Sequence, residues 1–481
     1  MRELEPTALW EIFYQITQIP RPSKKEEKIS AYLRDFASKH KLICKSDDTG
    51  NLLITKPATP GYEKQPTVIL QAHMDMVCEK NSNTQHDFDN DPIQAYIDGE
   101  WIRARGTTLG ADNGIGMAMM LAVLSSSELQ HPALECLFTV DEETGLTGAF
   151  ALSKDLLSGQ VLINLDSEDD GEIFIGCAGG IGTKANLPLK MVATPDGQFA
   201  FRVKVSGLTG GHSGGDIHLG LANAIKLLNR YLWTLNRQME VRLSEIKGGN
   251  LHNAIPREAE ALVVVPYSQK ETVRVLLNIF IADMQEAYAS IEPRAEITLN
   301  SESVPAKVME KDLSDRLLNA LYACPHGVKA MSRDIEGLVE TSTNLASVKM
   351  TESGHIEVNT SQRSSSEIAK KDIAAQVLSV FQLAGADVIQ SDGYPGWQPN
   401  LKSDILQVAK NSYQQLFGEE AKVKAIHAGL ECGLFLEKYP YLDMISIGPQ
   451  MYGVHSPDER LSINSTQKSW KWLVDILRQL R

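Results

Sequence analysis

The stretch that decides the fold spans residues 109–143 and has the sequence LGADNGIGMAMMLAVLSSSELQHPALECLFTVDEE. A glycine-rich turn opens this stretch, and the apolar run at residues 114–124 predicts a buried helix. A second apolar run, at residues 134–140, has the length of a strand and is followed directly by Asp141, Glu142 and Glu143. A buried helix next to a buried strand is typical of a sheet that helices cover on both faces.

The sequence on either side extends this pattern. Residues 67–70 and 161–165 predict two more buried strands, and residues 93–104 predict a hairpin. The order of helix and then strand returns from residue 401 to the end. Together these segments predict an α/β catalytic domain with a mostly parallel sheet, built from residues 1–181 and 392–481.

The middle of the chain has a different character. Its strand-like segments alternate between apolar and polar residues, as half-exposed strands do, and long amphipathic helices separate them. The predicted strands are residues 199–205, 241–246, 259–265, 295–300, 345–350 and 356–360, and the predicted helices lie near residues 217–236, 271–290 and 367–384. We therefore predict an inserted α+β lid domain at residues 182–391, which is also the candidate dimerisation surface of a homodimer.

Length and charge limit the classes of function. A chain of 481 residues is too long for one compact core, which agrees with two domains. Lys and Arg total 47 against 61 Asp and Glu, so the net charge of −14 argues against nucleic acid or an anionic membrane as the main partner. No apolar stretch is long enough to span a bilayer.

The N-terminus and the cysteines predict a cytoplasmic protein. The first residues are acidic and lack the apolar segment of a secretory signal. A helix is expected over residues 29–37, preceded by a capping box of Ser23 and Glu26. The six cysteines include no CxxC pair, which is typical of reduced core thiols.

Candidate metal ligands and catalytic groups occur in five short segments. They are His73 and Asp75 at the end of a strand, Asp112 in the glycine-rich turn, Glu142 and Glu143 after a strand, Asp166 after another strand, and His455 in a loop near the C-terminus. Each pattern alone is common in ordinary turns and strand ends. In a parallel sheet, however, successive strand ends meet along one edge, where α/β proteins bind ligands.

The residue types suit a pair of metal ions. Zinc-type cations take nitrogen and carboxylate ligands, and one carboxylate can bridge two of them at roughly 3.5–4 Å. A second carboxylate can orient a liganding histidine, which suits Asp75 beside His73. One further carboxylate is needed as a general base.

These motifs resemble a known family. His73-x-Asp75, the turn at residues 109–114, Glu142-Glu143-x-Gly145 and residues 453–456 are similar to motifs of the co-catalytic zinc metallopeptidases, which include carboxypeptidase G, aminoacylase and carnosinase. The longer strings HMDMV (73–77), GTTLGADNG (106–114) and HAGLECG (427–433) look like those of a bacterial dipeptidase branch of that family. The resemblance covers nearly the whole chain.

The resemblance implies two divalent metal ions, with zinc expected and cobalt or manganese as substitutes. Asp112 would bridge both ions, His73 and Asp166 would complete one site, and Glu143 and His455 would complete the other. Asp75 would orient His73. Glu142 would be the general base that activates a metal-bridged water and then protonates the leaving amine. The Asp112–Asn113 peptide bond would be cis.

The lid carries three further residues by the same resemblance. His212, within the glycine-rich segment 210–216, would stabilise the oxyanion of the tetrahedral intermediate. Asn253 would bind the substrate, and Arg363 would bind its carboxylate. Glycines on both sides of His212 would allow close backbone approach.

Three functions are compatible with this sequence. The first is a dipeptidase that hydrolyses unblocked dipeptides, Xaa-His included. The alternative on the same scaffold is a deacylase or a short-peptide aminopeptidase. The third is a binding protein without catalysis, and Glu142 argues against it because a binding protein has no use for a general base.

Overall fold

The computed structural model describes residue 1 and residues 3–481, which divide into two compact units. Unit 1 comprises residues 1–177, 397–425 and 430–481, and unit 2 comprises residues 178–396 and 426–429. The predicted boundaries, residues 182–391, differ from these by a few residues and place the short segment 426–429 with the catalytic domain. That segment groups with unit 2 because the amide of Ala178 donates to the carbonyl oxygens of Ile426 and Ala428, at 3.1 and 3.0 Å.

Unit 1 is built around an eight-stranded sheet with the order β1-β2-β6-β3-β7-β21-β8-β20. Its strands are β1 (Ile43–Ser46), β2 (Leu52–Lys56), β3 (Val68–His73), β6 (Leu134–Thr139), β7 (Val161–Asn164), β8 (Glu172–Cys177), β20 (Lys422–Ile426) and β21 (Asp443–Ser446). A smaller sheet holds β4 (Ala95–Asp98), β5 (Trp101–Ala104), β22 (Met451–Tyr452) and β23 (Arg460–Ser462). The predicted hairpin is confirmed as the β4–β5 pair.

Parallel pairing occupies the centre of the large sheet. β3 pairs in parallel with β6 and β7, and β7 with β21, whereas β1, β2 and β8 pair antiparallel on either side. Every residue of β3 and of β6 is buried, so both faces of the sheet are covered. The predicted α/β class is confirmed, and the carboxyl ends of β3, β6 and β7 meet at one edge of the sheet.

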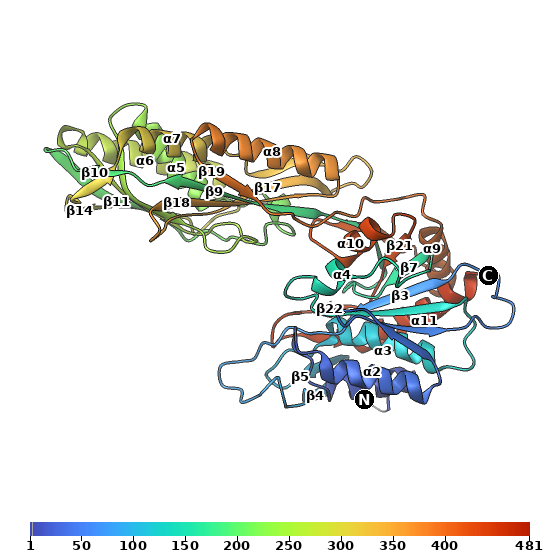
Figure 1. The fold of residues 1–481 in the computed structure, drawn as a ribbon. Helices are drawn as coiled ribbons and strands as arrows, with labels where there is room; N and C mark the ends of the chain where they lie inside the picture. The colour runs from blue at the N-terminus through green and yellow to red at the C-terminus, as the bar shows by residue number, and fades with distance from the viewer. Residues whose placement is uncertain (2) are drawn as a thin grey trace. The chain divides into compact units, whose positions relative to one another are not determined.

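Helices of unit 1 surround this sheet (Figure 1). They are α1 (Thr7–Thr17), α2 (Glu27–Lys39), α3 (Ala111–Ser125), α4 (Thr147–Ala151), α9 (Asp404–Phe417), α10 (Glu431–Lys438) and α11 (Ile463–Gln479). The predicted capping box of α2 is wrong, since its N-cap is Glu26 and no side chain caps the helix. The hydroxyl of Ser23 instead donates to Asp75 Oδ2 at 2.7 Å, so that residue serves the candidate site.

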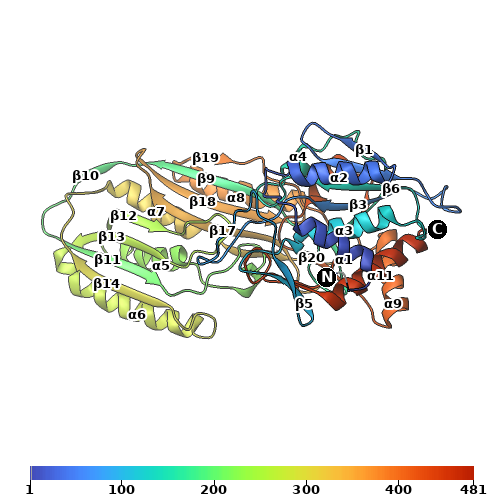
Figure 2. The ribbon, with the colours of Figure 1, turned by 90° about the horizontal axis from the view of Figure 1, so that it is seen from below.

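Unit 2 is an α+β unit with a nine-stranded antiparallel sheet, on one face of which the long helices lie (Figures 1 and 2). Its path is β14-β11-β13-β12-β17-β18-β9-β19, with β16 on β17. The strands are β9 (Gly179–Pro188), β11 (Gln198–Ser206), β12 (Arg242–Gly248), β13 (Ala259–Pro266), β14 (Glu296–Glu302), β16 (Gly327–Met331), β17 (Val339–Met350), β18 (His355–Ser364) and β19 (Asp387–Gln390), and a separate pair is β10 (Met191–Ala193) and β15 (Lys307–Met309).

The core of unit 2 lies between the sheet and its helices. The helices are α5 (Ala224–Asn236), α6 (Lys270–Tyr288), α7 (Lys311–Ala323) and α8 (Glu367–Leu383), with short turns η1 (Ile217–Leu219) and η2 (Tyr267–Gln269). Phe201, Leu228, Val263, Leu317 and Phe381 are buried members of this core. None of the helices in the described residues combines the length and hydropathy that a membrane crossing needs.

Candidate metal centre

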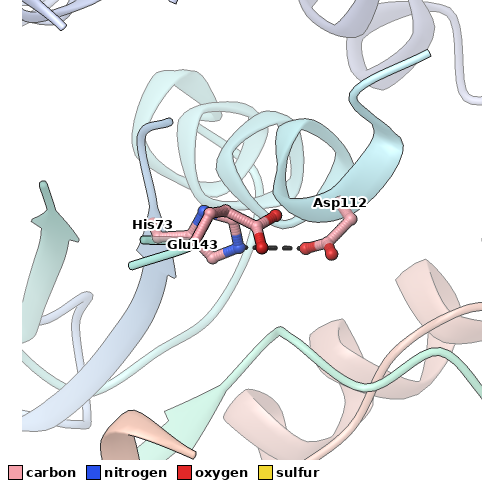
Figure 3. A group of neighbouring side chains, drawn as sticks. All are labelled: His73, Asp112 and Glu143. Carbon is pink, nitrogen blue, oxygen red and sulfur yellow. Dashed lines mark hydrogen bonds and ion pairs between the residues drawn. The ribbon is translucent and has the colours of Figure 1, made fainter. Parts of the chain in front are cut away.

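Three predicted ligands converge at the carboxyl edge of the unit 1 sheet (Figure 3). His73 is the last residue of β3, Asp112 lies in the first turn of α3, and Glu143 lies in the loop after β6. One ligand atom from each lies within 4.8 Å of the others. The Nε2 atom of His73 is 2.9 Å from Asp112 Oδ1.

The other two predicted ligands join the same cluster. His455 Nε2 lies 3.1 Å from Asp112 Oδ2 and 3.0 Å from Glu143 Oε2. Asp166 Oδ1 lies 3.3 Å from His73 Nε2. Each oxygen of Asp112 therefore faces a different histidine, which is the arrangement that a carboxylate bridging two cations requires.

The donor set fits two divalent cations. Each histidine Nε2 carries at most one hydrogen, yet each faces oxygens from two carboxylates. The second oxygen of Glu143 is buried and has no hydrogen-bond partner among the described residues. Crowded carboxylates with imidazole nitrogens between them suit zinc-type ions, which would supply the missing positive charge.

Asp75 lies against His73 and holds the turn that carries the two glutamates. Its Oδ1 lies 3.3 Å from His73 Nδ1, although the two atoms are not aligned for a hydrogen bond, and it accepts from the amide of Glu142 at 3.0 Å. Its Oδ2 accepts from the amide of Glu143 at 3.2 Å. Burial opposes ionisation of Asp75, but the interactions with His73 and the hydrogen bonds from its other neighbours outweigh burial and lower its pKa to about 2.

The carboxyl of Glu142 lies close to other charged side chains of the cluster. Burial raises the pKa of its carboxyl well above the usual range, and the neighbouring carboxylates of Asp166 and Glu431 raise it further, although His73 opposes them. A raised pKa makes this carboxylate a stronger base, which favours its accepting a proton from a neighbouring water.

Several residues that organise this site were missed in the sequence. Glu459, which is buried, accepts from the amides of Leu109, Gly110 and Ala111 at 2.6, 3.0 and 2.8 Å and so holds the turn before Asp112. Arg21 donates to the carbonyl oxygens of Met74 and Asp75 at 3.0 and 2.5 Å. Neither Glu459 nor Arg21 has a role that the neighbouring sequence indicates, so no local pattern could have identified it.

The residue after Asp112 also belongs to the site. The Asp112–Asn113 peptide bond is cis, as the resemblance implied. The side-chain amide of Asn113 donates to Asp166 Oδ1 at 2.5 Å. Asn113 therefore holds one predicted ligand while its neighbour Asp112 supplies another.

Unit 2 contains the other three predicted site residues. His212 Nδ1 accepts from the amide of Gly215 at 2.9 Å, so this nitrogen carries no hydrogen and Nε2 carries it instead. A Cβ atom on Gly214 would lie 2.3 Å from the carbonyl oxygen of His427, which explains the need for glycine there. The hydrogen bond from Gly215 therefore keeps His212 in the tautomer whose Nε2–H group is a donor.

Arg363 and Asn253 are placed by the same unit. Arg363 is buried, its Nη1 donates to the hydroxyl of Tyr394 at 2.8 Å, and its Nε has no partner among the described residues. Burial, together with the charge of Arg363, lowers the pKa of His212. The backbone carbonyl of Asn253 accepts from the amide of Ser213 at 2.7 Å, which ties the Asn253 loop to the His212 segment.

Comparison with known proteins identifies the family. Residues 69–479 match the model of peptidase family M20/M25/M40. The chain belongs to this family. The predicted class of hydrolase, a metallopeptidase, is thereby confirmed, and the match spans both units.

Individual relatives agree with the family assignment. The chain is 43% identical over 480 residues to the cytosol non-specific dipeptidase of Escherichia coli, covering 100% of this chain and 99% of that protein. The crystal structure of aminoacylhistidine dipeptidase from Vibrio alginolyticus is 43% identical with a TM-score of 0.93, covering 99% of this chain and 97% of that one. The longer sequence strings had pointed to this group, bacterial peptidase D, and that resemblance is confirmed.

A more distant member shares the fold. The aminopeptidase PepT of Bacillus cereus is 16% identical with a TM-score of 0.58, and the alignment covers 99% of each chain. At this identity the likeness extends to the fold alone.

Proposed function

We propose that this protein is a metal-dependent dipeptidase that hydrolyses the amide bond of unblocked dipeptides, Xaa-His included. The observation that carries the proposal is the full-length 43% identity to a cytosol non-specific dipeptidase, in a chain whose cluster of His73, Asp112 and Glu143 is intact. The name of the Vibrio relative supports aminoacyl-histidine substrates. The name of the Escherichia coli relative supports a cytoplasmic location.

Five side chains of unit 1 are assigned to two cations. Asp112 would bind both, His73 and Asp166 one of them, and Glu143 and His455 the other. Zinc is the expected ion, with cobalt or manganese as substitutes. When bound, the pair would polarise the substrate carbonyl and lower the pKa of water.

The remaining steps belong to the chain's own residues. Glu142 takes the proton of the attacking water and returns it to the leaving amine, for which its raised pKa is suited. Asp75 keeps the His73 ring oriented. His212, whose Nε2 carries the hydrogen, donates to the oxyanion that forms on the carbonyl.

Two residues of unit 2 are assigned to the substrate carboxylate. The buried guanidinium of Arg363 has a nitrogen without a protein partner, and a planar guanidinium can bind a carboxylate through two hydrogen bonds. Asn253 would contribute an amide. Binding of the free carboxylate would favour substrates with an unblocked C-terminus, as dipeptides have. We also assign unit 2 a dimerisation role, to be tested by light scattering.

A substrate panel tests the proposal. Metal-free protein reconstituted with zinc, cobalt or manganese is assayed on dipeptides, a tripeptide and an acetyl-amino acid. We expect hydrolysis of dipeptides only, loss of activity with a chelator, and loss of about one metal equivalent in His73→Ala or His455→Ala. Preferential cleavage of the acetyl-amino acid would favour a deacylase, and full turnover without metal would refute the two-metal assignment.

A further inference from the structure

A layer of buried polar side chains lies directly below the candidate metal ligands in the large sheet of unit 1. Gln71 on β3 is paired in register with Asn164 on β7, and Asn164 is paired with Ser446 on β21. Gln71 lies two residues before His73, so strand alternation turns both side chains to the same face. Asn164 likewise lies two residues before Asp166.

On β3, β7 and β21 the buried polar side chains below the ligands are confined to this layer. One step further down the same three strands, the residues in register are Ile69, Leu162 and Met444, all buried. Apolar packing is therefore available on this face of the sheet. On these three strands, hydrogen-bonding groups replace it in the layer next to the ligands.

The side chains of the layer form a connected network that ends at Glu431. Ser446 Oγ donates to Asn164 Oδ1 and Asn164 Nδ2 donates to Gln71 Oε1, both at 2.5 Å. Gln71 Nε2 donates to Glu431 Oε2 at 2.6 Å. Thr139, the last residue of β6, donates to the same oxygen at 2.9 Å. Glu431 therefore joins the ends of β3 and β6.

Glu431 is the first residue of α10 and is 0% exposed. Its other oxygen, Oε1, is buried and has no hydrogen-bond partner among the described residues. A buried polar network is often no more stabilising than apolar packing of the same volume, but its directional bonds fix the groups that it joins. Metal sites need that precision, because ligands must hold their geometry within about 0.5 Å.

We propose that Glu431 is a positioning residue of the metal centre. By accepting from Gln71 and Thr139, it sets the carboxyl ends of the two strands from which His73 and the Glu142–Glu143 turn project. The inference rests on the metal role proposed for those residues. The string at residues 427–433 contains none of the assigned metal ligands, and this inference gives that string a function.

Cobalt binding in the absence of substrate tests this role. Metal-free protein is titrated with Co²⁺ against a competing chelator, and the visible absorption spectrum of the loaded protein reports the coordination geometry. In Glu431→Ala two buried donors lose their acceptor, and we expect about 10- to 100-fold weaker binding and an altered spectrum, the range for outer partners of metal ligands. In Glu431→Gln one amide oxygen can accept both bonds, so affinity and spectrum should return towards wild type.

A matched control separates positioning from general stability. Glu135, near the opposite end of β6, is also a buried carboxylate, and it accepts from the amides of Ser158 and Gly159 at 3.0 Å each. Glu135→Ala should lower the melting temperature and leave the cobalt spectrum unchanged. If Glu431→Ala does not fold, Thr139→Val removes one donor with little change of shape and should shift the spectrum in the same direction.

Two results would overturn the inference. One is wild-type cobalt affinity and spectrum in Glu431→Ala, or in Thr139→Val where the alanine variant does not fold. The other is a spectral change in Glu135→Ala as large as that in Glu431→Ala. Dipeptide hydrolysis by the wild-type protein is measured separately, so its absence would refute the proposed function without altering the cobalt result.

Discussion

Glu459 offers a sharp test of how the turn before Asp112 is held. Its Oε2 accepts from the amides of Leu109 and Gly110, and its Oε1 accepts from the amide of Ala111. In Glu459→Gln only one of the two positions remains an acceptor, while the other becomes an NH2 group that faces a donor. The variant should therefore lose both stability and metal affinity.

The size of the loss follows from the number of amides left unpaired. If the glutamine oxygen occupies the Oε2 position, the amide of Ala111 loses its strong partner, and a buried unpaired amide costs about 1–3 kcal/mol. The turn places Asp112, which is assigned to both cations. If the lost hydrogen bond destabilises the metal-bound protein by this amount relative to the metal-free protein, the zinc dissociation constant should rise roughly 5- to 150-fold. The conversion is that about 1.4 kcal/mol corresponds to a factor of ten.

Urea unfolding of metal-free protein and zinc titration measure the two effects. Glu135→Ala is the control, because it removes the acceptor of two backbone amides but lies away from the ligands. It should lose stability and keep its zinc affinity. The reasoning fails if Glu459→Gln weakens zinc binding no more than Glu135→Ala does.

Three more predictions concern the base, the substrate carboxylate and pH. Glu142→Gln should reduce kcat by about 10²–10⁴-fold while the metal content stays near two ions per chain. Glu143→Gln should instead lose metal. Equal metal loss in both variants would show that the roles of the two glutamates are assigned wrongly. The wild type should cleave a dipeptide with an amidated C-terminus at a lower kcat/KM than the free dipeptide, and Arg363→Ala should largely abolish this difference. Equal kcat/KM for both substrates in the wild type would exclude binding of the substrate carboxylate by Arg363. Burial lowers the pKa of His326 to about 4. As the pH falls, the unfolded chain therefore takes up a proton on His326 at a higher pH than the folded chain does. The free energy of unfolding should be greatest above about pH 6.5 and should fall by roughly 3 kcal/mol as the pH drops towards 4. Urea unfolding of His326→Gln at a series of pH values should show a smaller decrease in the free energy of unfolding. An unchanged pH dependence in this variant would contradict the prediction.

The clustering of His73, Asp112 and Glu143 could be predicted because each of these residues lies in a local pattern. His73 and Asp75 follow a buried run, Glu142 and Glu143 follow another, and Asp112 stands in a turn before an apolar helix. The period of a strand and the length of an apolar run are properties of a few consecutive residues. The parallel order at the centre of the sheet then brings these strand ends to one edge.

Other local patterns were misleading because tertiary contacts compete with them. Ser23 and Glu26 have the spacing of a capping box, yet the Ser23 hydroxyl donates to Asp75, which lies far along the chain. Segment 426–429 follows the predicted boundary of the catalytic domain and still groups with unit 2, where its backbone pairs with Ala178. A hydroxyl or a strand segment takes the partner that the folded chain places beside it.

The sequence by itself determined the family, the α/β character of unit 1 and the residue types available for metal binding, because those depend on short-range periodicity and on contiguous motifs. Only the tertiary structure decided what supports the ligands. Glu459 lies about 350 positions from the turn that it holds, and Glu431 lies 360 positions from Gln71. Neither role could be read from the sequence, since a carboxylate acquires its role from the donors that folding brings to it and not from its neighbours along the chain.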